Sequence, residues 1–298
     1  MNLEEVIKIL KDQNNSKELY FFEKNNDEYI AVCPEASEEI FDIIINNAIE
    51  VMSKKGQDEW IHYNPVGVRD GTVEICNVDY VGNYAEVVNS LVPQHIEVDS
   101  ERIDKFSFYC VNIVKDDKVV RLFRRLTKFK KISSHGFLGL FQGKVFNRVD
   151  SKVLGIDGDI DLVVYDDEIM VLNHISLERI FKIEEQYEKK SKETIECLRN
   201  TGKIENFDSF KEDCLNSLST RKILTKMQNE GNDLSKCLDN FDNIVKTINI
   251  FELPINVNNN SKSIIYESKE QIVDILRLAR DSYYTSLVQE KPGIDNKI

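Results

Sequence analysis

The chain is 298 residues long and acidic, with 39 Lys and Arg residues against 52 Asp and Glu residues and a formal net charge of −13. Its apolar content of 41% is ordinary for a globular protein, and its apolar runs are far shorter than the roughly 20 residues of a membrane-spanning helix. The start of the chain, Met-Asn-Leu-Glu-Glu, lacks the positive region of a secretory signal, so we expect a cytoplasmic location.

The six cysteines and four histidines are scattered without metal-ligand spacing. The sequence has no C-x-x-C, H-x-x-x-H or H-E-x-x-H pair, and no glycine-rich phosphate-binding motif. In a chain without an export signal, scattered cysteines are more often buried free thiols than disulfides or zinc ligands. The spacing also gives no catalytic triad. The sequence therefore predicts no metal, no cofactor and no assignable catalytic residue.

The first half of the chain is typical of β-hairpins combined with one or two helices. Residues 18–23 and 28–33 predict two strands around an Asn-Asn-Asp turn. Residues 37–55 carry apolar side chains at helical spacing and predict an amphipathic helix that ends at Gly56. Two further hairpins are predicted, the first from residues 106–114 and 119–131, and the second from residues 160–165 and 169–173.

After residue 176 the apolar spacing predicts helices almost to the end of the chain. We expect helices over residues 177–200, 207–229 and 234–248. A last helix, started by a capping box at residues 268–271, should contain Ile272, Tyr283 and Leu287. An α+β fold follows, with a hairpin-rich N-terminal half and a mostly helical C-terminal half. We divide it into residues 1–105, whose role is not assigned, and residues 106–298.

One segment of this acidic chain is strongly basic. Nine Lys and Arg residues and no Asp or Glu occur from Lys118 to Arg148, so the rest of the chain carries about −22. Such a polarised charge distribution favours an anionic partner, and Arg and Lys suit phosphate groups. Interleaved phenylalanines could stack on unpaired bases. The predicted DNA-binding residues are Arg121, Arg124, Arg125, Lys128, Lys130 and Lys131, with further contacts expected from Lys144, Arg148 and Lys152.

On a strand, alternate side chains share a face. Arg124, Lys128 and Lys130 should therefore project together, with Arg121, Arg125 and Lys131 on the opposite face. The basic residues are also compatible with two roles that do not involve DNA. Lys and Arg on an exposed strand discourage edge-to-edge aggregation. A basic face can also dock the protein's own acidic helices, a partner protein or an anionic membrane.

The hairpin predicted at residues 160–173 carries several acids, which raises the question of metal-dependent chemistry. An EF-hand loop would need glycine at the position of Leu162, so calcium binding is disfavoured. A nuclease of the PD-(D/E)xK type is the second reading, with Asp159 and Asp161 as its acids. Its second strand should end in acid-x-Lys, but this chain has Leu172-Asn173-His174 there. A degenerate hairpin of this type that binds DNA without cutting it stays possible.

Three segments in order carry a family resemblance: LFRRLTKFKK, then IDGDIDLVVYDDEIMVLNHISLERIFKIEEQYEK, then ILRLARDSYYTSL. Over about residues 106–290 the chain resembles the KwaB-like family, the soluble component of the Kiwa antiphage defence system. The clearest part is the hairpin that leads into Leu177-Glu178-Arg179-Ile180-Phe181. The family has no agreed catalytic motif, so no catalytic residue is carried over.

The resemblance implies a cytoplasmic antiphage effector that binds phage DNA and blocks its replication or expression. It further implies a small multi-spanning membrane protein of the same defence system as partner, through which the chain would associate with the membrane. The expected assembly is a homodimer or a higher homo-oligomer. The alternatives are a metal-dependent nuclease and an interaction scaffold that does not bind DNA.

Overall fold

The structure is a computed structural model that describes residues 1–24, 28–56, 59–67, 72–95, 102–126, 138–142, 145–149, 154–230 and 233–295. Contacts divide the chain into two compact units, which we describe separately. Unit 1 comprises Met1–Tyr63 and Val68–Ile183, and unit 2 comprises Asn64–Gly67 and Glu184–Ile298. The N-terminal half is rich in strands and the C-terminal half is helical, which confirms the predicted α+β class. The functional boundary expected at residue 105 stays a prediction.

Unit 1 is built on an eight-stranded sheet with the order β2-β1-β5-β6-β9-β10-β4-β3. Neighbouring strands are antiparallel except β3 and β4, which are parallel. The strands are β1 (Ser16–Lys24), β2 (Tyr29–Val32), β3 (Glu59–His62), β4 (Thr72–Asn77), β5 (Phe106–Lys115), β6 (Lys118–Arg125), β9 (Leu162–Tyr165) and β10 (Glu168–Val171).

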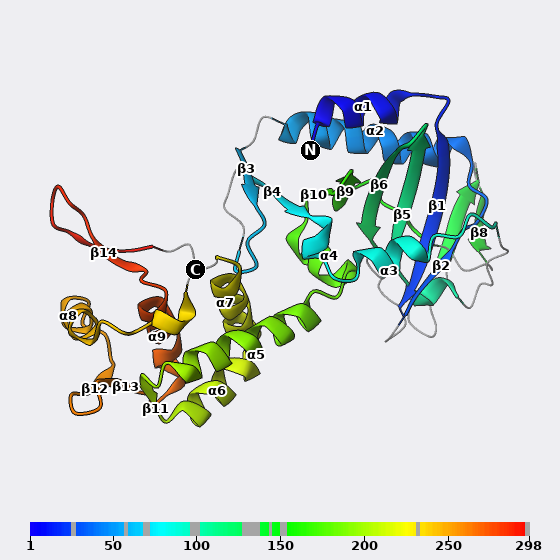
Figure 1. Cartoon of the computed structure of the whole chain (residues 1–298). Coiled ribbons are helices and arrows are strands. Elements are labelled where there is room, and N and C mark those ends of the chain that lie inside the picture. The colour runs from blue at the N-terminus through cyan, green and yellow to red at the C-terminus, as the bar shows by residue number, and fades with distance from the viewer. Residues whose placement is uncertain are drawn as a thin grey trace. The chain divides into compact units, whose positions relative to one another are not determined.

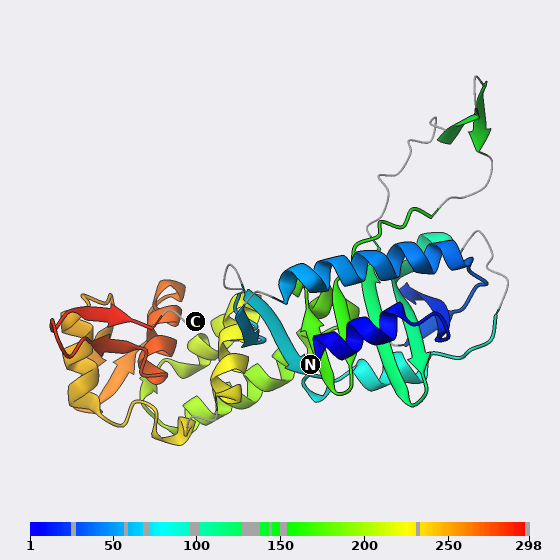
Figure 2. The same ribbon diagram turned by 90° about the horizontal axis from the view of Figure 1, so that it is seen from above.

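Helices cover both faces of this sheet (Figures 1 and 2). On one face lie α1 (Leu3–Lys11) and α2 (Glu38–Lys55), and on the other α3 (Tyr84–Asn89) and α4 (His174–Ile180). The helix predicted at residues 37–55 is α2, which ends at its C-cap Gly56 as expected. Ile44, Ala48 and Met52 of this helix are buried against the sheet. Because both faces are covered, the central strands are apolar on both sides.

The strand that carries the basic residues lies inside the sheet. β6 pairs with β5 on one side, from Lys118 opposite Lys115 to Arg125 opposite Phe108, and with β9 on the other. It is therefore an interior strand, and its arginines do not protect a sheet edge. The predicted strand over residues 119–131 ends at Arg125, and residues 127–137 lie outside the described part. A separate hairpin is formed by β7 (Leu138–Gln142) and β8 (Val145–Val149).

Unit 2 has its own apolar core, and from the end of unit 1 onward the helices are shorter than the sequence predicted. The helix expected at residues 177–200 is two helices, α4 and α5 (Glu184–Asn200). The helix is interrupted between them because Lys182 adopts a left-handed φ of 51°. The N–H of Ile183 then bonds to the carbonyl of Glu178. This geometry ends a helix and lets Phe181 and Ile183 be buried.

Two further predicted helices are also divided. The segment at residues 207–229 forms α6 (Phe207–Asn216) and α7 (Leu218–Asn229), because Ser217 is extended and its side chain caps α7 by accepting from the N–H of Thr220. In the segment at residues 234–248 a short 3-10 turn, Leu234–Lys236, precedes α8 (Phe241–Ile250). Apolar spacing alone predicted one continuous helix in each segment. The polar residues Ser217 and Asn240 instead cap the start of a new helix within it.

The capping box predicted at residues 268–271 is confirmed and precedes α9 (Ile272–Ala279). The extension of this helix through Tyr283 and Leu287 was wrong. Asp281 has a left-handed φ of 55°, and the chain then forms a hairpin of β14 (Tyr283–Thr285) and β15 (Pro292–Ile294). The remaining strands of unit 2 are β11 (Ile204–Glu205), β12 (Asn256–Asn258) and β13 (Ser263–Ile265). Across the described residues, every helix is too short or too polar to span a bilayer.

Candidate nucleic-acid interface

Half of the six predicted DNA-binding residues lie on described strands. Arg121, Arg124 and Arg125 are on β6. Lys128, Lys130 and Lys131 lie outside the described residues, as do Lys144 and Lys152, while Arg148 belongs to β8. The structure therefore places the first, arginine-rich part of the basic segment.

Arg121 and Arg124 project to opposite faces of the sheet, as the strand alternation predicted. The Nη1 of Arg121 donates to the hydroxyl of Tyr84 on α3 at 3.0 Å. Arg124 instead lies on the face covered by α1 and α2, where Val120 and Leu122 of the same strand join the core. These two arginines therefore cannot form one continuous row.

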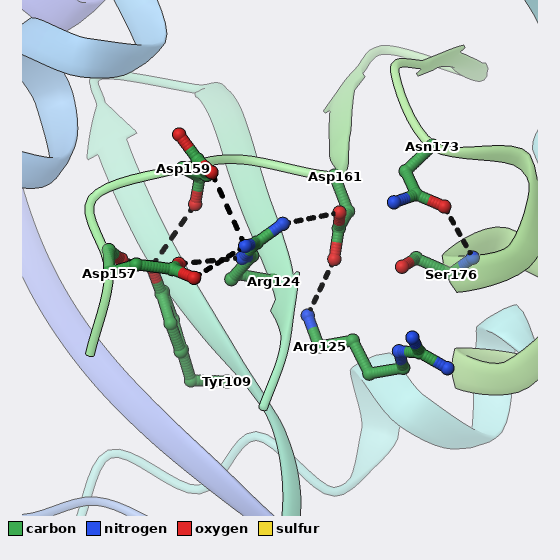
Figure 3. Close-up of polar contacts among 8 residues, drawn as sticks. All are labelled: Tyr109, Arg124, Arg125, Asp157, Asp159, Asp161, Asn173 and Ser176. Atoms are coloured by element: carbon green, nitrogen blue, oxygen red, sulfur yellow. Dashed lines mark hydrogen bonds and ion pairs between the residues drawn. The ribbon is translucent and has the colours of Figure 1, made fainter. Parts of the chain in front are cut away.

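Arg124 is surrounded by three aspartates from the segment before β9 (Figure 3). Its Nε and Nη2 donate to the two oxygens of Asp157 at 2.8 and 2.6 Å. Its Nη1 donates to Oδ1 of Asp161 at 2.8 Å, and Nη2 reaches Asp159 at 3.4 Å. Hydrogen bonding to Asp157, outweighing the effect of burial, raises the pKa of the Arg124 guanidinium. One positive charge therefore faces three negative charges.

Asp161 is the fixed member of this cluster. Its side chain is 1% exposed, and its second carboxylate oxygen accepts the backbone N–H of Arg125 at 2.7 Å. Its own backbone N–H bonds to the carbonyl of Phe123, and its carbonyl accepts from the N–H groups of Leu172 and Asn173. Asp161 thus joins β6 to the hairpin of β9 and β10 through both its side chain and its backbone.

The guanidinium of Arg125 points away from this cluster, although its backbone N–H is part of it (Figure 3). Other cations of the same hairpin pair within unit 1. Lys118 forms an ion pair with Glu5 of α1, and Lys115 pairs with Asp12. Lys118 and Arg124 therefore dock onto acidic groups of the protein itself, which is one of the two roles without DNA that the sequence allows.

The nuclease reading assigned Asp159 and Asp161 to a metal. In the structure both carboxylates contact Arg124. The described residues include no cluster of His, Cys, Asp and Glu arranged to hold a metal ion. Asn173 lies where a nuclease of this type would have its acid-x-Lys motif. Its side chain instead caps α4 by accepting the N–H of Ser176 at 3.1 Å. In the described geometry, the acids before β9 hold Arg124.

A second polar cluster in unit 1 was missed from the sequence. The Nδ1 of His174 contacts Glu74 on β4 at 2.9 Å, and its Nε2 contacts Glu178 at 3.1 Å. Burial lowers the pKa of His174, but its hydrogen bonds to Glu178 and Glu74 outweigh this and raise it to about 9. Tyr63 stacks on the imidazole, with ring centroids 4.8 Å apart, and donates to Glu178 at 3.1 Å.

One signal in the sequence could have indicated this cluster. His174 and Glu178 are four residues apart and share a helix face. Glu74 and Tyr63 are about a hundred residues earlier in the chain, so only the tertiary structure brings them to this histidine.

Comparison with known proteins identifies a family. The family model described as "Kiwa protein KwaB-like" matches residues 103–289. No curated protein and no solved structure matches the chain. The matched range covers both hairpins of the candidate interface and most of unit 2.

Proposed function

The chain belongs to the KwaB-like family of Kiwa proteins, and from this premise we propose that it is a DNA-binding effector of Kiwa antiphage defence. Membership of the family supports the role in defence. The observation that carries DNA binding is the basic segment from Lys118 to Arg148, which has nine cations and no acid in a chain of net charge −13. Electrostatic attraction to phosphate supplies most of the non-specific affinity for DNA.

We assign the phosphate contacts chiefly to Arg125, Lys128, Lys130 and Lys131. Arg125 is the last residue of β6, and its side chain points away from the aspartates that surround Arg124 (Figure 3). The three lysines follow within six residues of it in the sequence. Arg121 contributes less in this proposal, because its guanidinium donates to Tyr84. Bound DNA would then be blocked from replication or expression.

The proposal includes two kinds of protein partner. One is a small multi-spanning membrane protein of the same defence system, which would hold this chain near the membrane. The other is a second copy of the chain. The acidic bulk of each protomer repels DNA, so a homodimer or higher oligomer that presents several basic segments to one duplex would raise the affinity.

The test is the salt dependence of DNA binding, measured by fluorescence anisotropy with labelled duplex and single-stranded DNA. We compare the wild type with a variant in which Lys128, Lys130 and Lys131 are replaced by Gln. The matched control replaces three exposed lysines of α1 and α2, Lys8, Lys11 and Lys54, by Gln and removes the same charge. Arg124 stays unchanged, because its loss would leave Asp161 buried without its cation at a cost of about 3–5 kcal/mol.

The expected result is weaker binding by the first variant alone. The slope of log K against log salt should fall by about 0.9 for each phosphate contact removed. Equal slopes in the wild type and both variants would exclude the basic segment as the DNA site. The products are run on a gel with magnesium, where cut DNA would favour the nuclease alternative. Absence of DNA binding at low salt would favour a protein or a membrane, in place of DNA, as the partner of the basic segment.

A further inference from the structure

Asp157 occupies the edge of the Arg124 guanidinium that arginine commonly uses to bind phosphate. Asp157 accepts from Nε and Nη2 through its two oxygens at 2.8 and 2.6 Å, which is a bidentate pair. Phosphate binds arginine through the same planar fork, with the same two parallel hydrogen bonds. A phosphate group could therefore contact this edge of Arg124 only by displacing Asp157.

The three aspartates differ in how firmly they are held. Asp161 is 1% exposed and fixed in the fold, and it holds Nη1 from the inner side. The side chains of Asp157 and Asp159 are 52% and 75% exposed. If the two outer carboxylates moved away, Asp161 would still hold the guanidinium, with its Nε edge open to solvent.

The segment that carries the outer aspartates is irregular, and its apolar residue Ile160 is buried in the core while the aspartates face outward. Residues 154–161 form neither helix nor strand. The hydroxyl of Tyr109 reaches the carbonyl oxygens of Asp157 and Asp159 at 3.4 and 3.5 Å, near the upper limit for a hydrogen bond (Figure 3). Because the side chains of Asp157 and Asp159 are exposed, they can turn away from Arg124 while the backbone of the segment stays anchored by Ile160.

We propose that Asp157 and Asp159 form an autoinhibitory clasp that competes with nucleic-acid phosphate for Arg124. This inference rests on the proposed DNA-binding function and concerns the regulation of the same site. In the closed clasp, one guanidinium and three carboxylates carry a net charge of −2 at the end of β6. The clasp therefore blocks one phosphate contact and repels the phosphates next to it.

The test neutralises the clasp without changing its shape. Asp157 and Asp159 are both replaced by Asn, which keeps the size of each side chain and removes two negative charges. The matched control replaces Asp116 and Asp117 by Asn. These two exposed aspartates occupy the turn at the opposite end of β6, and Asn also tolerates the left-handed φ of 52° at Asp116. DNA affinity and its salt dependence are measured for both variants and the wild type.

We expect the clasp variant to bind DNA about tenfold more tightly at low salt and its salt slope to steepen by about 0.9, as one phosphate contact is gained. The control variant should show neither change. If the clasp variant fails to fold by circular dichroism, Asp157→Asn alone is compared with Asp117→Asn, because Asp157 is the carboxylate that occupies the Nε edge of Arg124.

The outcomes separate this inference from the proposed function. An equal gain in both variants would mean that total charge, not Arg124, limits binding, and would overturn the clasp. DNA binding by the wild type with no gain in the clasp variant would also overturn the clasp while leaving DNA binding intact. If no variant binds DNA at low salt, the proposed function fails and the clasp fails with it.

Discussion

His174 of α4 is an ionisable side chain whose charge depends on its folded surroundings. In the imidazolium form, both ring nitrogens donate, Nδ1 to Glu74 at 2.9 Å and Nε2 to Glu178 at 3.1 Å. Glu74 is 2% exposed, so loss of the proton would leave a buried carboxylate with a weaker partner. The cluster therefore favours the charged histidine, and this preference makes the stability of unit 1 depend on pH.

We predict that the stabilisation by His174 is lost at alkaline pH. The pKa of His174 is about 9 in the folded protein against an ordinary 6.5, so the contribution is fully present below pH 6.5 and disappears as the pH rises through 9. Relative to His174→Gln, the wild type should lose on the order of 3 kcal/mol between pH 6.5 and pH 9.5, since one pKa unit corresponds to about 1.4 kcal/mol.

Urea unfolding of both proteins at several pH values in this range measures the difference. His62→Gln serves as the control, because it is the same substitution at an exposed histidine of β3. A difference between the wild type and His174→Gln that stays constant from pH 6.5 to pH 9.5 would contradict the prediction.

At the scale of elements, Gly158 shows how the aspartate segment is seated on α2. A Cβ built at this position would overlap Nδ2 of Asn47, and it would lie 3.1 Å from Cγ of Asn47 and 3.5 Å from Cγ2 of Ile43. The backbone can approach α2 this closely because residue 158 has no side chain. This close approach sets the backbone positions of the neighbouring Asp157 and Asp159.

We expect Gly158→Ala to destabilise the protein by about 1–3 kcal/mol, because Asn47 has to move to accept the methyl group. In an Asn47→Ala background the space is open, and the same substitution should be neutral or stabilise the fold by up to about 1 kcal/mol through the unfolded state. Chemical denaturation of the four proteins in this double-mutant cycle measures the coupling. Equal effects in both backgrounds would show that Asn47 is not the obstacle.

At the scale of the whole molecule, each unit has an apolar cluster of its own. Leu122 of β6 belongs to the cluster of unit 1, and Leu224 of α7 belongs to that of unit 2; both side chains are fully buried. The chain passes from unit 1 to unit 2 between Ile183 and Glu184. The short segment Asn64–Gly67, which comes earlier in the chain, also belongs to unit 2. Such an arrangement favours local stability that differs between the units.

We predict that core truncations act on the unit that contains them. Leu224→Ala should lower the amide-exchange protection of unit 2 by about 2–5 kcal/mol, and Leu122→Ala should do the same for unit 1. Hydrogen exchange followed by mass spectrometry measures both units in each variant. An equal loss of protection in both units from either substitution would mean that they unfold as one cooperative structure.

Local patterns were enough to predict a large part of this architecture. The amphipathic helix ending at Gly56, the hairpins at residues 106–125 and 162–171, and the capping box at Ser268 follow from spacing, turn residues and caps, all of which act over a few residues. The helix breaks at Lys182 and Ser217 were missed, because apolar spacing continues through them and only burial and capping stop the helix.

The sequence by itself determined the α+β class, the resemblance to the Kiwa KwaB-like family and the concentration of positive charge between Lys118 and Arg148. Only the tertiary structure decided which acids face those charges. Asp157 and Asp161 are more than thirty residues from Arg124, and sheet pairing of β6 with β9 brings them together. Charge composition is additive along a chain, whereas the pairing of charges depends on contacts between distant segments, which the fold alone creates.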